Sequence, residues 1–244
     1  MKHTVSIVNY YNTTPFLYGL KHTGFDAEIQ LELDIPIVCA QKLKNKQVDI
    51  GLVPVAILPE LESYHIITNY CIGAIGKVDS VKLFSQKPLE ELTHVLLDYQ
   101  SKTSVALVQL LNKHFWKKNI QFVNTKEGFE NEISGTVGAV IIGDRTFGLT
   151  SPPYQYDLSE EWFNYTGLPF VFACWVSKVK LDDGFIDAFN NALMYGMNHI
   201  KESVIEKPND TKGFDALDYL QNKISYTLDQ EKRKGLDLFL KLIE

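Results

Sequence analysis

Residues 96–111 read LLDYQSKTSVALVQLL, and their pattern indicates the fold class. Together with His94 and Val95, the first of these residues form a short apolar run that predicts a buried strand. The last of them, Val105–Leu111, carry apolar side chains at helical spacing. A strand that passes through a hydroxyl-rich turn into a helix is typical of an α/β protein. The unpaired N–H groups of the first helical turn, the helix dipole and the hydroxyls together predict an anion pocket.

The turn contains the hydroxyls of Ser101, Thr103 and Ser104, and two interpretations of it are open. It lacks the Gly-x-x-x-x-Gly-Lys pattern of a nucleotide phosphate loop, so a carboxylate is the better guest. In that case all three side chains bind substrate. Alternatively, Ser101 or Thr103 only caps the helix, because Ser and Thr are common at the N-cap.

Strands and helices alternate along the rest of the chain. Strands are expected at residues 4–8, 27–33, 48–53, 64–69, 78–84, 95–97, 120–123, 138–142 and 170–176. Helices are expected at residues 14–20, 35–46, 101–116, 182–200, 213–222 and 228–242. This alternation predicts βαβ units and a mostly parallel sheet.

Two breaks favour two lobes over a single doubly wound domain, which is the alternative. A polar segment at Ser85–Pro88 precedes a fresh βαβ series, and the apolar strand at 170–176 leads into an all-helical tail. A tail that folds back places two chain crossings between the lobes, with the ligand in the cleft. We therefore expect one lobe from residues 1–85 and 177–244 and a second from residues 86–176.

The bulk composition disfavours several classes of protein. The 244 residues carry a formal net charge of −6, which argues against a nucleic-acid partner. No stretch reaches the length of a transmembrane helix and no signal peptide precedes the first strand, so we expect no membrane partner and a cytoplasmic location. The three cysteines, Cys39, Cys71 and Cys174, lie in apolar surroundings without a C-x-x-C pair, which suits a reducing compartment.

Polar residues follow two of the predicted strands, at the edge where open α/β sheets bind ligands. Asn12 offers both a donor and an acceptor after the first strand, and Tyr10 and Tyr11 beside it offer flat apolar walls. An Asx-type cap of the following helix is the alternative for Asn12. Asp144 follows a buried strand and is placed to orient a ligand hydroxyl, unless it pairs with Arg145 or caps the next turn.

Familiar catalytic motifs are missing from the sequence. Gly73 and Gly76 lack the third glycine and the strand–helix context of a dinucleotide site, and Gly76 instead predicts a hairpin turn. The six histidines have no metal-ligand spacing, and no Gly-x-Ser-x-Gly elbow occurs. The sequence thus supports neither a metal site nor a catalytic triad. It fits a binding protein, or an enzyme that acts by orientation and electrostatics.

Six segments carry a resemblance to a known family, in this order along the chain: NYYNTTPF at 9–16, DIGLVP at 49–54, GKVDSV at 76–81, LDYQSKTS at 97–104, IGD at 142–144 and WFNYTGLPFVFACW at 162–175. The set resembles the chorismate dehydratases of the futalosine route to menaquinone. It covers most of the chain up to Trp175, and the tail beyond is less distinctive. The resemblance implies a two-lobed periplasmic-binding-protein-like (type II) α/β fold, used in the cytoplasm as an enzyme.

The resemblance also implies an activity and its residues. Chorismate would lose water to give 3-[(1-carboxyvinyl)oxy]benzoate, with no cofactor and no metal. Asn12 and Ser80 match active-site positions of the family, and Thr103 and Ser104 match its carboxylate-binding turn. The chain departs from the family pattern at Gly73-Ala74, where many members carry two serines, so hydroxyl contacts from those positions are not expected.

Because no protein base is evident, we hypothesise that the side-chain carboxylate of chorismate removes the C3 proton while Asn12 and Ser80 hold the geometry. Two other functions compete with this one. The first is a non-catalytic protein of the same fold that binds small carboxylates. The second is the sister enzyme of the pathway, which cleaves cyclic dehypoxanthine futalosine and is expected to use a histidine in its second lobe. Residues 125–175 contain no histidine, which argues against that enzyme.

Overall fold

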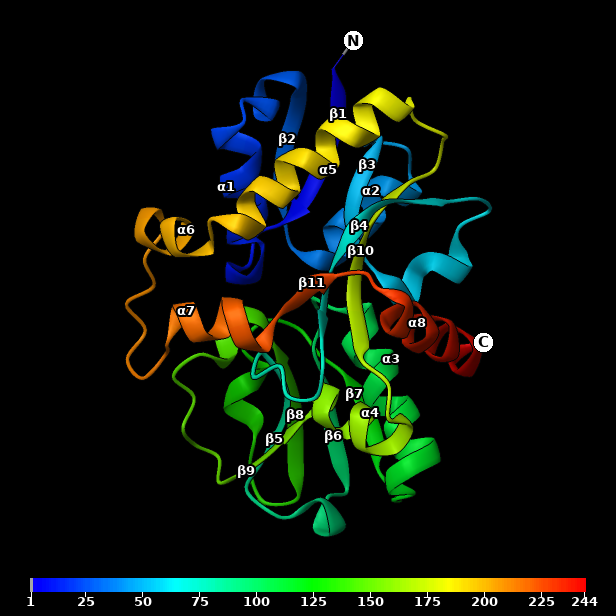
Figure 1. Cartoon of the computed structure of the whole chain (residues 1–244). Coiled ribbons are helices and arrows are strands. Elements are labelled where there is room, and N and C mark those ends of the chain that lie inside the picture. The colour runs from blue at the N-terminus through cyan, green and yellow to red at the C-terminus, as the bar shows by residue number, and fades with distance from the viewer. Residues whose placement is uncertain (1) are drawn as a thin grey trace.

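The computed structural model describes residues 2–244 and contains two mixed sheets, one above the other in Figure 1. The upper sheet has six strands in the order β11-β4-β10-β3-β1-β2. Its strands are β1 (His3–Val8), β2 (Ile29–Asp34), β3 (Ile50–Pro54), β4 (His65–Ala74), β10 (Phe170–Ser177) and β11 (Ser225–Thr227). It is flanked by the helices α1 (Thr14–His22), α2 (Pro36–Lys44), α5 (Asp183–Asn198) and α6 (Ile200–Glu206).

The lower sheet has five strands in the order β7-β6-β8-β5-β9. They are β5 (Val81–Ser85), β6 (His94–Leu97), β7 (Gln121–Asn124), β8 (Val137–Ile142) and β9 (Tyr154–Asp157). The helices α3 (Lys102–Leu111) and α4 (Leu158–Thr166) pack against each other beside this sheet. The tail, with α7 (Ala216–Asp218), the π-helical turn Tyr219–Lys223 and α8 (Gln230–Ile243), runs across the middle of the molecule.

Strand directions differ from the mostly parallel sheet that the alternating pattern predicts. β1 pairs in parallel with β2 and β3, and β6 pairs in parallel with β7 and β8. The remaining pairs are antiparallel, because β10 enters between β3 and β4, and β5 lies between β8 and β9. All eight residues of β10 are buried, which matches its unbroken apolar sequence FVFACWVS.

The chain crosses between the sheets at points that differ from the expected lobe boundaries. β5 (Val81–Ser85) pairs with β8 and β9 in the lower sheet, although the boundary at residue 85 assigned it to the first lobe. β10 pairs with β3 and β4 in the upper sheet, although the boundary at residue 176 assigned it to the second lobe. Register with neighbouring strands decides sheet membership, and a polar break in the sequence does not report it.

Two further local predictions are wrong. Gly76, with φ +73°, does not form a hairpin, because the strands on either side of it belong to different sheets. The tail is not all-helical, because β11 adds to the edge of β4. A three-residue strand at a sheet edge has too few residues to show an alternating pattern.

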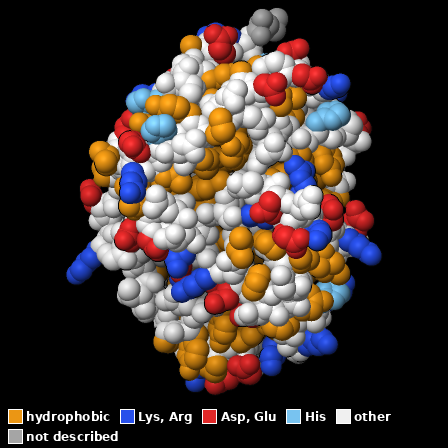
Figure 2. All heavy atoms as spheres, in the orientation of Figure 1, with side chains coloured by type: hydrophobic (Ala, Val, Ile, Leu, Met, Phe, Trp, Pro, Cys, Tyr) orange, Lys and Arg blue, Asp and Glu red, His pale blue; other side chains and the backbone are white. Residues whose placement is uncertain are grey.

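None of the helices that the structure describes is long and apolar enough to cross a membrane. On the face shown in Figure 2, Lys and Arg side chains are interspersed with Asp and Glu. The three cysteines are buried free thiols.

Candidate active site

A narrow cavity of about 50 Å³ lies where the two sheets, the crossing strands and the tail meet. Its polar lining residues are Tyr10, Asn12, Ser80, Ser101 and Ser104. The rest of the lining is apolar side chains and glycine: Val8, Pro36, Pro54, Ile72, Val78, Val81, Ile142, Gly143, Phe172, Ala173 and Ile224. An apolar cavity with a few polar groups is the usual form of a small-molecule site.

Asn12 lies in the 3₁₀ turn Tyr11–Thr13 at the carboxyl end of β1. Its backbone carbonyl accepts a hydrogen bond from the Tyr226 hydroxyl at 2.9 Å, which fixes the turn to the tail. Its side-chain Oδ1 is buried and has no hydrogen-bond partner among the described residues. A buried acceptor without a partner is costly, so this oxygen is suited to accept a hydrogen bond from a ligand in the cavity.

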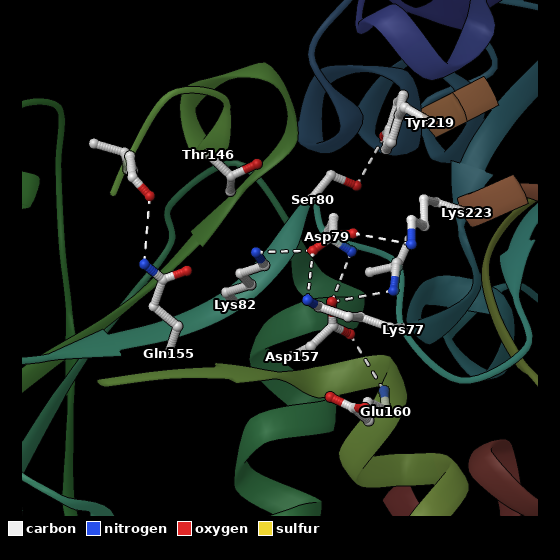
Figure 3. Close-up of polar contacts among 12 residues, drawn as sticks. Lys77, Asp79, Ser80, Lys82, Thr146, Gln155, Asp157, Glu160, Tyr219 and Lys223 are labelled. Carbon is white, nitrogen blue, oxygen red and sulfur yellow. Dashed lines mark hydrogen bonds and ion pairs between the residues drawn. The ribbon is translucent and has the colours of Figure 1, made fainter. Parts of the chain in front are cut away.

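Ser80 comes from the segment that leads into β5, and it is almost fully buried. Two backbone N–H groups just before it, those of Val78 and Asp79, donate to Asp157 Oδ2 at 3.0 and 2.6 Å. The Ser80 carbonyl accepts from Gly143 N at 2.8 Å, and its Oγ accepts from the Tyr219 hydroxyl at 2.8 Å. Figure 3 shows Ser80 and Tyr219 pointing toward each other above the Asp79 side chain. Ser80 is therefore held through its carbonyl by the turn after β8 and through its hydroxyl by the tail.

Asp79 has a φ of +67°, which is uncommon for a residue with a side chain. Its carboxylate lies near three ammonium groups: Lys82 at 3.0 Å, Lys77 at 3.2 Å and Lys223 at 3.7 Å (Figure 3). These ion pairs, led by Lys82, hold the pKa of Asp79 below its usual range against the opposing effect of burial. The charged side chain thus anchors the turn immediately before Ser80.

The first turn of α3 combines the two interpretations that its sequence left open. Ser101 is the N-cap, since its Oγ accepts from Ser104 N at 3.2 Å, and its hydroxyl also donates to Ser104 Oγ at 3.1 Å. Both serines nevertheless line the cavity. Thr103 lies on the other side of the helix, where its Oγ1 accepts from Ala56 N and donates to Phe172 O, both at 3.2 Å. Thr103 therefore fastens α3 to the upper sheet and does not line the cavity.

Tyr11 and Asp144 also lie outside the cavity lining, contrary to the role predicted for them. The Tyr11 hydroxyl donates to Lys207 O at 2.8 Å, away from the cavity. The Asp144 carboxylate accepts from the backbone N–H of Tyr11 and so links the two lobes. Arg145 does not pair with it: the guanidinium binds Asp98 and Glu130, at 2.7 Å from the latter. Burial raises the pKa of Asp98, although the ion pair with Arg145 opposes that effect.

Tyr10 takes the place at the cavity that Tyr11 was expected to share. Its hydroxyl donates to Gln100 Oε1 across the cleft, and its ring lies against Gly143. A Cβ at Gly143 would come within 2.7 Å of that ring, and the residue has φ +66°, so glycine is required there. Of the lining residues that the structure describes, Tyr10 alone is titratable, and burial raises its pKa.

Gly73 and Ala74, where the sequence departs from the resembled family, are buried in β4 and do not line the cavity. A Cβ at Gly73 would lie 2.8 Å from the carbonyl oxygen of Phe170. The close pairing of β4 with β10 thus excludes a serine at position 73 without a backbone shift.

The sequence is similar to a known protein family and to a named relative. The sequence profile of a family described as menaquinone biosynthesis matches residues 3–244. The chain belongs to this menaquinone biosynthesis family. One relative is a chorismate dehydratase from Thermus thermophilus, which is 28% identical over 97% of this chain and 93% of the relative.

Solved structures agree on the fold of this family member. A protein from Archaeoglobus fulgidus matches with a TM-score of 0.77 at 12% identity, over 99% of this chain and 96% of that one. A Candida albicans gene product described as having the generic periplasmic binding protein fold matches with a TM-score of 0.64 at 12% identity, over 100% of this chain and 90% of that one. The family member thus has the two-lobed periplasmic-binding-protein-like fold, with its cavity between the lobes.

Sequence reasoning missed Tyr219, whose hydroxyl contacts a cavity residue from the tail. Tyr219 lies in a π-helical turn at the end of a predicted helix, with no strand edge or turn motif beside it. Only the path of the tail across the cleft brings it to Ser80.

Proposed function

We propose that this protein eliminates water from chorismate to give 3-[(1-carboxyvinyl)oxy]benzoate in menaquinone biosynthesis. The observation that carries the proposal is the cavity itself, which brings the unpartnered Asn12 Oδ1 and the Ser80 hydroxyl to the same space as the start of α3. The 28% identity to a chorismate dehydratase over nearly the whole chain supports the same substrate.

The residues that line the cavity offer complementary groups for both ends of this substrate, and the space of about 50 Å³ has to widen by movement of the lobes to admit it. Chorismate carries two carboxylates, and the hydroxyls of Ser101 and Ser104 at the N-terminus of α3 suit one of them. The ring hydroxyl can accept from Ser80 and donate to Asn12 Oδ1. The apolar walls, including Ile72 and Phe172, suit the ring.

The reaction needs a base for the C3 proton and an exit for the C4 hydroxyl. We propose that the enolpyruvyl carboxylate of chorismate takes the proton, while the C–O bond at C4 breaks. The electron pair of the C3–H bond becomes the new ring double bond, and the proton and hydroxide leave as water. Support comes from the lining, where Tyr10 is the one titratable side chain among the described residues and its raised pKa keeps it protonated. Aromatisation supplies the driving force, so orientation by Asn12 and Ser80 is the task left to the protein.

Ultraviolet absorbance with chorismate as the substrate tests this function. Saturable loss of chorismate at a rate proportional to protein concentration is the expected result. Stoichiometric binding without loss of chorismate would instead favour the non-catalytic carboxylate-binding protein. The proposed base is tested separately: an analogue with the enolpyruvyl carboxylate converted to an amide should bind and not react, whereas normal turnover of the amide would exclude that base.

The division into lobes and the compartment are also proposals. We assign residues 1–85 and 177–244 to one lobe and residues 86–176 to the other, with two exceptions. β5 belongs to the second lobe and β10 to the first, because each pairs with strands of that lobe's sheet. The three buried free thiols support a reducing compartment such as the cytoplasm.

A further inference from the structure

We propose that Tyr219 is a positioning residue that orients the Ser80 hydroxyl so that its proton points into the cavity. This inference rests on the proposed function, because it assigns Ser80 a task in turnover. It concerns a residue of the tail, the part of the chain in which the sequence shows no functional motif.

The contact joins distant parts of the chain inside the protein. The Tyr219 hydroxyl donates to Ser80 Oγ at 2.8 Å, and both side chains are buried. Burial raises the pKa of Tyr219 far above neutral pH, so the phenol keeps the proton that it donates. Its ring is held by two others, Phe147 and Phe214, whose centroids lie 5.0 and 5.3 Å away.

The direction of this hydrogen bond determines where the serine proton goes. Ser80 Oγ accepts from Tyr219, and Tyr219 is the hydrogen-bond partner of that oxygen among the described residues. The serine's own O–H is then left to donate elsewhere, and Ser80 lines the cavity. Without the tyrosine hydroxyl, the serine hydroxyl would rotate among its staggered positions.

A second contact from the same turn steadies the first. Lys223 lies four residues after Tyr219, and its Nζ is 3.7 Å from the carboxylate of Asp79, the residue before Ser80 (Figure 3). The π-helical turn Tyr219–Lys223 thus contacts two consecutive residues, Asp79 and Ser80. We call these two contacts the tail clamp. Because the tail and β5 belong to different parts of the fold, the clamp couples the position of Ser80 to closure of the cleft.

The test is steady-state kinetics of the full chain carrying Tyr219→Phe, which keeps the ring and removes the hydroxyl. We expect kcat with chorismate to fall roughly 10- to 100-fold and KM to stay within about twofold, because ground-state binding does not need the orientation of one hydroxyl. Tyr156→Phe is the control: its hydroxyl accepts from Leu89 N at 2.8 Å, outside the cavity, and its loss should leave kcat unchanged. Thermal unfolding checks that each variant is folded.

A double-mutant cycle with Ser80→Ala separates orientation from a merely structural role. If Tyr219 acts through Ser80, adding Tyr219→Phe to Ser80→Ala causes no further loss of kcat. If the fold-losses of kcat in the two single variants multiply in the double variant, the proposal is overturned. A folded Tyr219→Phe variant with wild-type kcat would also overturn it. Lys223→Gln removes the ion pair with Asp79, the second contact of the tail clamp, and should lower kcat several-fold. If kcat is unchanged in both Tyr219→Phe and Lys223→Gln, the tail clamp does not couple the position of Ser80 to closure of the cleft. Absence of turnover by wild-type protein and Tyr156→Phe alike would instead overturn the proposed function, and with it the role of Tyr219.

Discussion

The carboxylate of Asp144 accepts the backbone N–H of Tyr11, with its two oxygens 2.9 and 3.1 Å from the nitrogen. Asp144 follows β8 of the lower sheet, and Tyr11 follows β1 of the upper sheet. A residue that the sequence presents as a ligand contact therefore links the segments that follow strands of the two sheets. Closure and binding are coupled wherever a ligand binds only one of two conformations.

Asp144→Ala should weaken substrate binding without touching the cavity. Loss of this charge-assisted hydrogen bond between the lobes favours the open form, and we expect KM to rise up to about tenfold with kcat little changed. Asp144→Asn keeps one acceptor oxygen and should show a smaller rise. Steady-state kinetics measures both. A fall in kcat with normal KM would mean that Asp144 acts in the reaction itself.

Asn12→Ala should lower turnover without lowering stability. Asn12 Oδ1 has no hydrogen-bond partner among the described residues, so its removal relieves an unsatisfied acceptor. We expect an unchanged or raised melting temperature and a loss of kcat of about 100-fold or more. Calorimetry and turnover measured on the same preparation check this combination. A lowered melting temperature with normal kcat would assign Asn12 a structural role only.

Removal of the Thr103 hydroxyl and removal of the Ser104 hydroxyl should have different effects, although the two residues are neighbours in the sequence. Ser104 lines the cavity, so Ser104→Ala is expected to raise KM several-fold with little effect on stability. Thr103→Val removes the side-chain hydrogen bonds to Ala56 N–H and Phe172 C=O and should cost about 1–3 kcal/mol of stability. Denaturant unfolding and KM values distinguish the two variants. A raised KM for Thr103→Val together with a normal KM for Ser104→Ala would instead place the substrate carboxylate at Thr103.

Asp157 should make stability depend on pH in an unusual direction. Burial raises its pKa to about 6, so between about pH 4 and 6 the folded protein keeps a proton that the unfolded chain has released. The unfolded state then binds fewer protons, and this group's contribution to stability falls as pH rises through that window, by roughly 3 kcal/mol in all.

Unfolding of Asp157→Asn at several pH values checks this. The variant loses hydrogen bonds to backbone N–H groups and should be less stable than wild type near pH 4, but the gap should narrow toward pH 7. Glu160→Gln, an exposed carboxyl on the same turn, is the control and should not change the slope. A gap that widens with rising pH would mean that the pKa of Asp157 is lowered in the fold.

The sequence predicts the α/β class and the position of Asn12, Ser80 and the start of α3 at one cavity, and it predicts their surroundings less well. Runs such as residues 94–97 and 170–176 are apolar enough to report burial on both faces. The rotation of α3 about its axis, which turns Ser104 toward the cavity and Thr103 away from it, depends on packing against β10 and the Val55–Glu60 turn.

Long-range pairing accounts for the other differences. β5 and β10 join the sheets opposite to those expected because strand register, set by distant segments, decides membership. Tyr219 reaches Ser80 across 139 residues of chain, and no local pattern encodes such a contact.

Mass detection of the product after purified protein is incubated with chorismate tests the proposed dehydration most directly. We expect a product lighter than chorismate by one water, formed by wild-type protein and strongly reduced for Ser80→Ala. Full recovery of unchanged chorismate with folded wild-type protein would contradict it.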